Sequence, residues 1–88
     1  MTAVSDFGFT IGKGLRYRVT VGPDRHRGGY SAKLVADGLG VIMEPNGTSP
    51  SDALTRLARE LWASDATDRK IAKEIVKHAW FPLKLKVA

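Results

Sequence analysis

The sequence contains no cysteine among its 88 residues, which excludes both a disulfide framework and a thiolate metal site. A secreted domain of this size would more often carry disulfides. The first residues, MTAVSDFGF, contain neither the basic nor the apolar region of a signal peptide. No apolar run approaches the roughly 20 residues that a membrane span needs. We therefore expect a cytoplasmic protein that does not enter a membrane.

Catalytic motifs are also missing from the sequence. It contains no P-loop, no dinucleotide-binding glycine motif and no zinc-ligand spacing. The two histidines, His26 and His78, are far apart in the sequence, and the nine carboxylates are scattered along it. No nucleophile elbow or orienting acid accompanies either histidine. We therefore expect no catalytic residue, no metal and no cofactor, and a protein that is not an enzyme.

The length and the charge of the chain limit its architecture and its partners. A chain of 88 residues is expected to form a single domain, 1–88, with little room for a deep cavity. Fourteen Lys and Arg residues outnumber nine Asp and Glu residues, so the net charge is +5 and the isoelectric point is about 9.9. Such a balance permits an anionic partner, either a nucleic acid or an acidic protein surface.

Three segments alternate between apolar and polar residues, as strands with one buried face do. They span residues 15–21, 30–36 and 41–44. The alternation predicts a basic and partly apolar outer face, with Arg16, Arg18, Ser31, Lys33, Val35 and Ile42. The side chains expected on the inner face are Leu15, Tyr17, Val19, Val21, Tyr30, Ala32, Leu34, Ala36, Val41 and Met43.

Turn residues separate these predicted strands. The loop 22–29 has glycine at both ends, is too long for a tight hairpin and is expected to be mobile. The dipeptide 37–38, Asp-Gly, is a hairpin signal, and the Pro-Asn-Gly sequence at 45–47 closes the meander. Upstream, the alternation over 7–11 predicts a short additional strand or an arm on the core. Residues 1–6 are polar or small and are expected to be frayed.

The start of a helix over 48–62 is the sharpest local signal in the chain. Ser49 suits the N-cap position, Pro50 the first helical position, and Asp52 completes an acidic capping box. The residues at helical spacing on its inner face are Ala53, Leu54, Leu57, Ala58, Leu61 and Trp62, and Trp62 is expected to be buried.

A second helix is predicted from the polar break at 64–68 to about Trp80, and Pro82 ends it. Trp80 and Phe81 either cap the core or form part of an exposed contact surface. Its inward-facing residues are expected to be Ile71, Ala72, Ile75, Val76 and Ala79. Residues 83–88 form either an edge strand with lysines on it or a tail. The order of elements predicts an α+β fold, a three- or four-stranded antiparallel meander with two helices packed on one face.

Two groups of cations are candidates for a binding surface. Five potential cations fall within 16–27, and a row at helical spacing follows on the second helix. The candidate binding residues are Arg16, Arg18, Arg25, His26, Arg27, Lys33, Arg69, Lys73 and Lys77. The first group could meet a protein or, with Tyr17 and Tyr30 as stacking rings, a nucleic acid. Solvated surface charge also accounts for both groups, and an open strand edge at 41–44 or 83–87 leaves room for a homodimer.

The passage 28–62, GGYSAKLVADGLGVIMEPNGTSPSDALTRLARELW, resembles the small β-β-β-α lobe of the HicB-type antitoxins. The matching positions are Gly29, Tyr30, Gly47, Ser49, Ala53 and Leu54. The resemblance implies a small lobe that binds a protein and regulates or inhibits it. Phage-encoded inhibitors such as the anti-CRISPR proteins are similar in size and layout.

Two departures separate the chain from the antitoxin pattern. The family normally adds a C-terminal DNA-binding module, and residues 65–88 are too few for a helix-turn-helix after one helix. The family lobe also tends to be acidic, whereas this chain is basic. Double-stranded-RNA-binding and integrase arm-binding domains share the same layout, so the alternative function is a nucleic-acid-binding domain that uses Arg16, Arg18, Arg25 and Arg27.

Overall fold

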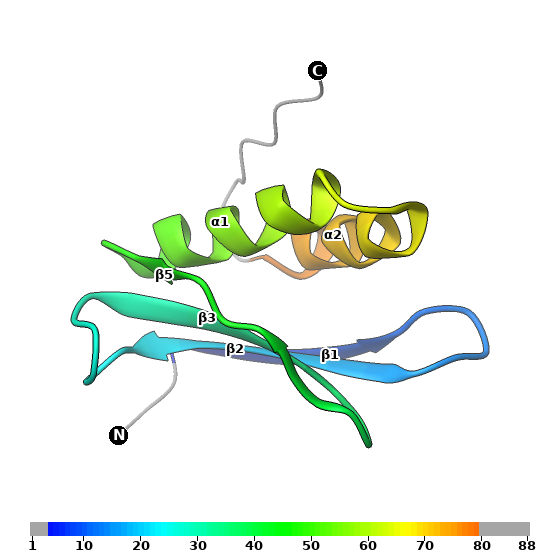
Figure 1. The fold of residues 1–88 in the computed structure, drawn as a ribbon, viewed down its shortest axis with the longest axis horizontal. Helices are drawn as coiled ribbons and strands as arrows, with labels where there is room; N and C mark the ends of the chain where they lie inside the picture. Colours follow the sequence, from blue (N-terminus) through cyan, green and yellow to red (C-terminus); the bar gives the residue numbers. More distant parts are fainter. Residues whose placement is uncertain (1–3, 80–88) are drawn as a thin grey trace.

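A computed structural model describes residues 4–79, which form one antiparallel sheet with two helices on one of its faces (Figure 1). Both termini of the described chain belong to regular elements or lie directly beside them. The α+β prediction is confirmed, and the arm predicted at 7–11 is part of a strand. The elements are β1 (Ser5–Thr10), β2 (Arg16–Pro23), β3 (Tyr30–Ala36), β4 (Gly40–Met43), β5 (Asn46–Gly47), α1 (Pro50–Trp62) and α2 (Ala66–His78).

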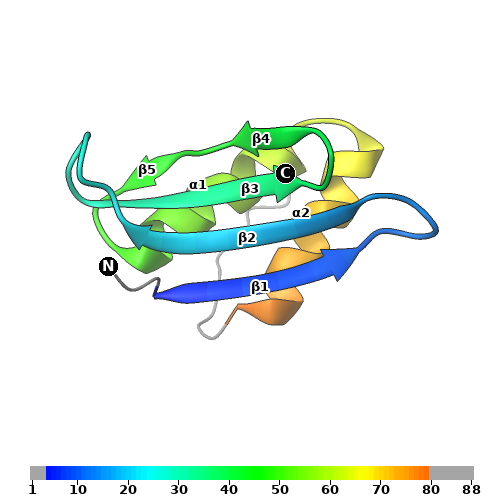
Figure 2. The same cartoon turned by 90° about the horizontal axis from the view of Figure 1, so that it is seen from below.

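The strands β1 to β4 form a meander in chain order, and all neighbouring strands are antiparallel. Seen from below, the outer face of the sheet lies in front of both helices, and β1 lies at one edge (Figure 2). Ser5 and Asp6, which were expected to be frayed, pair with Val21 and Thr20. The prediction of a frayed start is therefore wrong for these two residues, because pairing with β2 orders them.

The segment predicted as a closing turn rejoins the sheet instead. Asn46 and Gly47 form β5, which pairs with Ser31 and Tyr30 of β3 beyond the end of β4. A Cβ atom on Gly47 would lie 2.5 Å from the backbone nitrogen of Ala53. The absence of a side chain at Gly47 therefore lets the chain pass directly under the first turn of α1.

The predicted caps form at both helices. The Ser49 hydroxyl accepts a hydrogen bond from the Asp52 backbone nitrogen at 3.0 Å, and Pro50 opens α1. The Asp52 carboxylate accepts from the backbone nitrogen of Thr48 at 2.8 Å, so the box closes one residue earlier than the standard arrangement. That hydrogen bond is the main reason that the pKa of Asp52 is lowered. Asp65 caps α2 in the same way, through the Asp68 nitrogen.

The core lies between the inner face of the sheet and the two helices, and no polar or charged residue of 4–79 is buried in it. The apolar stripe of α1 is buried as predicted, and α2 packs beside it. The fully buried larger side chains are Val19, Val21, Leu34, Leu54, Leu57, Leu61 and Ile75. Trp62, expected to be buried, is only half-buried at the rim, with the Lys73 ammonium 5.9 Å from its ring centroid.

Three side chains expected in the core are exposed. Leu15 precedes β2, lies in the turn, and is 40% exposed. Val76 is 39% exposed because α2 buries a narrow stripe formed by Ile71, Ala72 and Ile75, and Val76 lies at its border.

Val41 is the third, and a β-bulge explains it. Met43 pairs with Leu34 on the inner side, but Val41 pairs with Val35, so the register shifts by one residue at Ile42. Val41 therefore points outward and is 55% exposed. The predictions for Trp80, Phe81, Pro82 and residues 83–88 lie outside the described residues.

Candidate functional site

The outer face of the sheet carries three of the predicted binding residues. Pairing of Thr20 with Lys33, and of Arg18 with Val35, places these side chains on one face because opposite residues of antiparallel strands share a side. Arg16 lies further along β2 on the same face. No element of residues 4–79 covers this face (Figure 2).

Arg18 has a carboxylate partner within residues 4–79, whereas Arg16 has none. The Arg18 guanidinium donates two hydrogen bonds to the Asp6 carboxylate, at 2.8 and 3.2 Å. These bonds lower the pKa of Asp6 and raise that of Arg18. The Arg16 side chain makes no hydrogen bond or ion pair with any residue of 4–79. Arg16 is therefore the more available cation.

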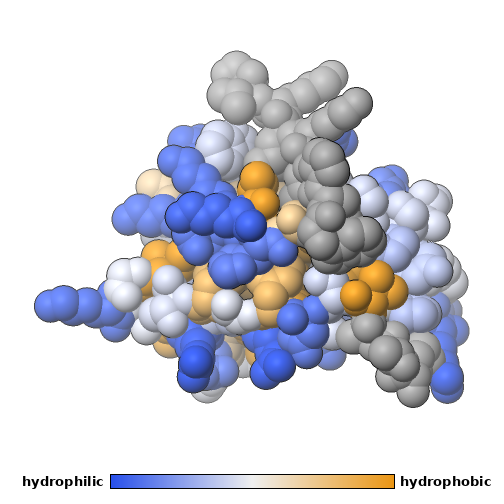
Figure 3. Space-filling model, turned by 180° about the vertical axis from the view of Figure 1, so that it is seen from behind, coloured by the Kyte–Doolittle hydropathy of each residue, from blue (hydrophilic) through white to orange (hydrophobic). Residues whose placement is uncertain are grey.

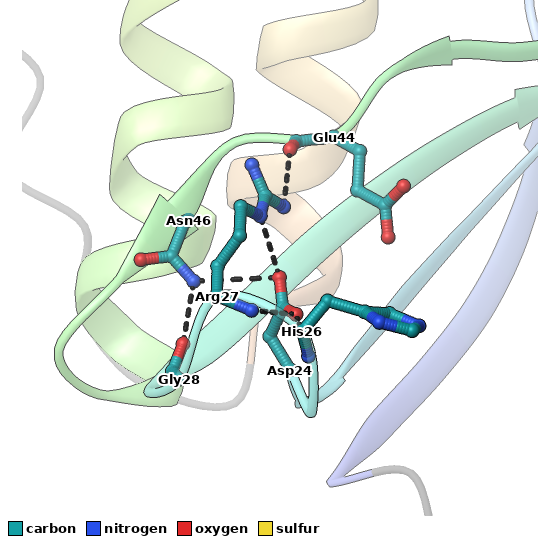
Figure 4. A network of polar contacts seen from close by, with 6 residues as sticks. All are labelled: Asp24, His26, Arg27, Gly28, Glu44 and Asn46. Atoms are coloured by element: carbon teal, nitrogen blue, oxygen red, sulfur yellow. Dashed lines mark hydrogen bonds and ion pairs between the residues drawn. The ribbon is translucent and has the colours of Figure 1, made fainter.

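The loop between β2 and β3 is organised around the Asp24 carboxylate (Figure 4). Its oxygens accept hydrogen bonds from the backbone nitrogens of His26 and Arg27, at 3.0 and 2.9 Å, and from Arg27 Nε at 2.7 Å. Asn46 donates through Nδ2 to the Gly28 carbonyl at 2.8 Å. Since the hydrogen bonds from Arg27 and His26 stabilise the carboxylate, the pKa of Asp24 falls to about 2. Contrary to the expected mobility, the structure shows a hydrogen-bonded turn.

Arg27, one of the predicted binding residues, belongs to this network. Its guanidinium lies between the Asp24 carboxylate and the Glu44 carbonyl, to which Nη2 donates at 2.8 Å (Figure 4). The Asp24 side chain is only 8% exposed. Arg27 thus joins the loop to the segment after β4, while Arg25 and His26 remain exposed.

The predicted cluster of cations within 16–27 is spread along the sheet. Arg16 begins β2 and Arg25 follows its end, so they lie at opposite ends of the strand. At ~3.3 Å per residue, β2 separates them by roughly 25 Å. Arg18 and Arg27 both have carboxylate partners within the chain. The structure therefore does not bring the five predicted cations together.

The predicted row on α2 lies on the helical side of the molecule, away from the outer face (Figure 1). Arg69 donates through Nε to the Trp62 carbonyl at 3.0 Å, and Lys77 contacts Glu74 at 3.1 Å. Lys73 lies over the Trp62 ring. Lys70, which the sequence analysis did not select, is exposed and has no partner within 4–79.

Apolar side chains accompany the cations on the outer face, and sequence reasoning found them only in part. Leu39 is 65% exposed and lies in the β3–β4 turn between Gly38 and Gly40, whose φ angles are +81° and +84°. Val41 and Ile42 follow in the bulged strand. The available signal was Leu39 itself, a leucine between two turn glycines, since connecting turns run over the protein surface. We define Leu39, Val41 and Ile42 as the apolar patch.

Neither histidine is placed for nucleophilic catalysis. The imidazole ring of His78 stacks on Phe7 with a centroid distance of 5.3 Å, and its Nε2 lies 3.8 Å from Glu74 Oε1. His26 lies in the loop and has no serine or threonine hydroxyl as a partner within 4–79. Over the same residues, no three His, Asp or Glu side chains are grouped so that they could hold a metal ion.

Comparison of the chain with models of protein families, with curated proteins and with solved structures finds no match. Neither helix within 4–79 is long and apolar enough to cross a membrane.

Proposed function

We propose that this chain is a non-enzymatic binding protein that docks on a protein partner through the outer face of its sheet. One observation carries the proposal: the apolar patch is solvent-exposed on the same sheet as two cations, Arg16 and Lys33, that have no partner within 4–79. Apolar side chains that gather at the surface mark protein-binding sites, and charges typically surround the buried centre of an interface. Leu39 is the most exposed of the three and is the expected anchor.

A nucleic acid is the weaker alternative for this face. Backbone phosphates need several free cations close together, but Arg18 and Arg27 are paired and Arg16 and Arg25 lie at opposite ends of β2. Tyr17, which the nucleic-acid alternative would use as a stacking ring, points inward as the strand alternation predicts and packs against the core, with its ring 5.8 Å from that of Phe9. These contacts favour a protein partner.

The test compares three forms of the purified chain as bait: the natural sequence, a patch variant with Leu39→Ser, Val41→Thr and Ile42→Thr, and a control variant with Arg25→Ala. We expect the natural chain and the control to retain a partner protein at high salt. The patch variant should not retain it. Purified, that partner should bind the patch variant at least about tenfold more weakly, as loss of buried anchors predicts.

Fluorescence anisotropy with labelled duplex DNA and single-stranded RNA provides the counter-test. A protein interface with apolar anchors should depend little on salt, whereas duplex DNA binding weakens with a slope near −0.9 per phosphate contact. Tight nucleic-acid binding at physiological salt that is lost in Arg16→Ala would overturn the proposal. Equal partner binding by the patch variant would overturn it as well.

A further inference from the structure

Within residues 4–79, the outer edge of β1 pairs with no other strand. Among the described strands β1 pairs only with β2, and six consecutive residue pairs join them without a register shift. β1 contains neither proline nor lysine, which commonly protect exposed edges. The opposite edge of the sheet is different, since β4 has four residues and a bulge, and Pro45 separates it from β5. β1 therefore offers the longer regular row of free backbone N–H and C=O groups.

Two hollows flank this edge, one on each face of the sheet. The hollow on the outer face has a volume of about 470 Å³ and extends from Gly8 and Thr10 of β1 across Arg16 and Arg18 of β2 to Asp37. The hollow on the helical side has a volume of about 270 Å³ and lies between the end of β1 and the α2 residues Lys70, Lys73, Glu74 and Lys77, of which Glu74 pairs with Lys77. Thr10 lines both. A strand placed beside β1 would thus direct alternate side chains toward the two hollows.

Both hollows contain cations that are not neutralised within 4–79. Arg16 has no partner on the outer side, and Lys70 has none on the helical side. Seen from behind, where the edge of β1 faces the viewer, hydrophilic side chains lie above and below a narrower apolar band (Figure 3). Phe7 is half-buried at this edge, with the exposed His78 stacked on it. The edge therefore combines backbone hydrogen-bonding groups, an apolar rim and positive charge on both faces.

We propose that the free edge of β1 binds an extended, acidic segment of a partner protein as an additional strand of the sheet. Backbone hydrogen bonds to β1 supply affinity in this mode, and carboxylates directed toward Arg16 and Lys70 supply specificity. A second copy of this chain fits poorly, because it would bring the lysines of two α2 helices together. A nucleic acid would satisfy the cations but would leave the backbone groups of β1 without strand partners.

The surface is distinct from the apolar patch, because β1 and β4 lie at opposite edges of the sheet (Figure 2). Arg16 belongs to both surfaces, but Lys70 belongs only to this one and the apolar patch only to the other, so Lys70→Glu and the patch variant each change one surface alone. Failure of this proposal is therefore distinguishable from failure of the proposed function.

The probe is a capped, fluorescein-labelled peptide that is long enough to span β1 and consists of glutamate, threonine and valine. Glutamates occupy both odd and even positions, so that carboxylates point toward both faces of the sheet. Its matched control has the same sequence and charge but carries N-methyl groups on alternate backbone nitrogens, which removes ladder donors. We expect the N-methylated peptide to bind at least about tenfold more weakly. In amide hydrogen exchange followed by NMR, the unmodified peptide should increase the protection of β1.

Variants of the protein test the two cations. Arg16→Glu with Lys70→Glu should weaken peptide binding about tenfold, since both cations become repulsive. Arg25→Glu with Arg56→Glu makes the same change in net charge away from this edge, because Arg56 lies beside Pro45 and Asn46, and should change binding less than about twofold. Thermal unfolding verifies that both variants are folded.

Several results would overturn the proposal. Equal binding of the N-methylated peptide would mean that charge attraction alone, without backbone hydrogen bonds, accounts for the binding. Equal losses in both charge variants, absence of peptide binding, or exchange protection elsewhere than β1 would each reject the site. Tighter binding of a single-stranded oligonucleotide of the same charge, lost in Arg16→Glu with Lys70→Glu, would assign the edge to nucleic acid instead.

Discussion

Arg27 Nε donates a hydrogen bond to Asp24 Oδ2 at 2.7 Å, and this contact determines how the loop between β2 and β3 is held. The same arginine also donates to the carbonyl of Glu44, which lies on the segment leading to β5. One side chain therefore joins two connections that are distant in the sequence. A residue that the sequence presents as a candidate binding cation is largely occupied in holding its own fold together.

Replacing Asp24 should change the acid stability of the protein. Its pKa is lowered from 3.8 to about 2, so its stabilising effect is complete above pH ~4 and is lost as the pH falls toward 2. Asp24→Asn should lower the Tm at pH 6 and flatten the loss of stability between pH 4 and 2. Calorimetry over pH 2–6 measures both effects. An unchanged slope would show that this carboxylate does not stabilise the folded loop.

A side chain at Gly47 should destabilise the protein. In Gly47→Ala the new Cβ would lie 2.5 Å from the Ala53 nitrogen and 2.8 Å from its Cα, so β5 or α1 must move, at a cost of about 1–3 kcal/mol. Gly12→Ala is the matched control, because its Cβ would meet no atom within 4 Å and only its φ of +59° is unfavourable. In urea unfolding, Gly47→Ala should have a lower free energy of unfolding than Gly12→Ala. The reverse order would contradict the close approach.

Two adjacent residues test the orientation of α2. Ile75 is fully buried, so Ile75→Ala should cost about 2–5 kcal/mol of the free energy of unfolding. Val76 is 39% exposed, and Val76→Ala should change that free energy by about 0.5 kcal/mol or less. Similar losses for the two variants in urea unfolding would mean that Val76 packs in the core, as the helical periodicity alone suggests.

The Ser49 hydroxyl is expected to stabilise the start of α1. Ser49→Ala removes the hydrogen bond from the Asp52 nitrogen and should cost about 1 kcal/mol, whereas Ser49→Asp should retain most of the stability. Ser51→Ala, at an exposed position in the same turn, serves as the control. If the Ser49 and Ser51 variants unfold at the same urea concentration, the cap makes no net contribution.

The exposed apolar patch should contribute little to the folded state. Val41→Thr and Ile42→Thr together are expected to change the free energy of unfolding by about 0.5 kcal/mol or less, because exposed side chains lose little contact when replaced. Leu34→Ala, on the inner face of the neighbouring strand, should cost about 2–5 kcal/mol. Chemical denaturation of the natural protein, the double threonine variant and Leu34→Ala measures the free energy of unfolding of each. A large loss in the threonine variant would argue that these residues serve folding rather than binding.

Most elements of this fold follow from the sequence alone. The alternation in β2 and β3, the Ser49 cap and the apolar stripe of α1 are local patterns, and each specifies its own element without information from distant residues. They also predict that Lys33 and Arg18 share the outer face, because alternation decides the side on which a residue lies.

Only the tertiary structure decided which charges are free and which apolar residues are exposed. The bulge at Ile42 turns Val41 outward, and bulges depend on pairing with β3 rather than on the local pattern. Asp6 meets Arg18 only because β1 pairs with β2, and Arg27 reaches Glu44 only because β5 returns to β3. Local periodicity specifies elements and their faces, whereas ion pairs, bulges and free edges depend on residues that are distant in the chain.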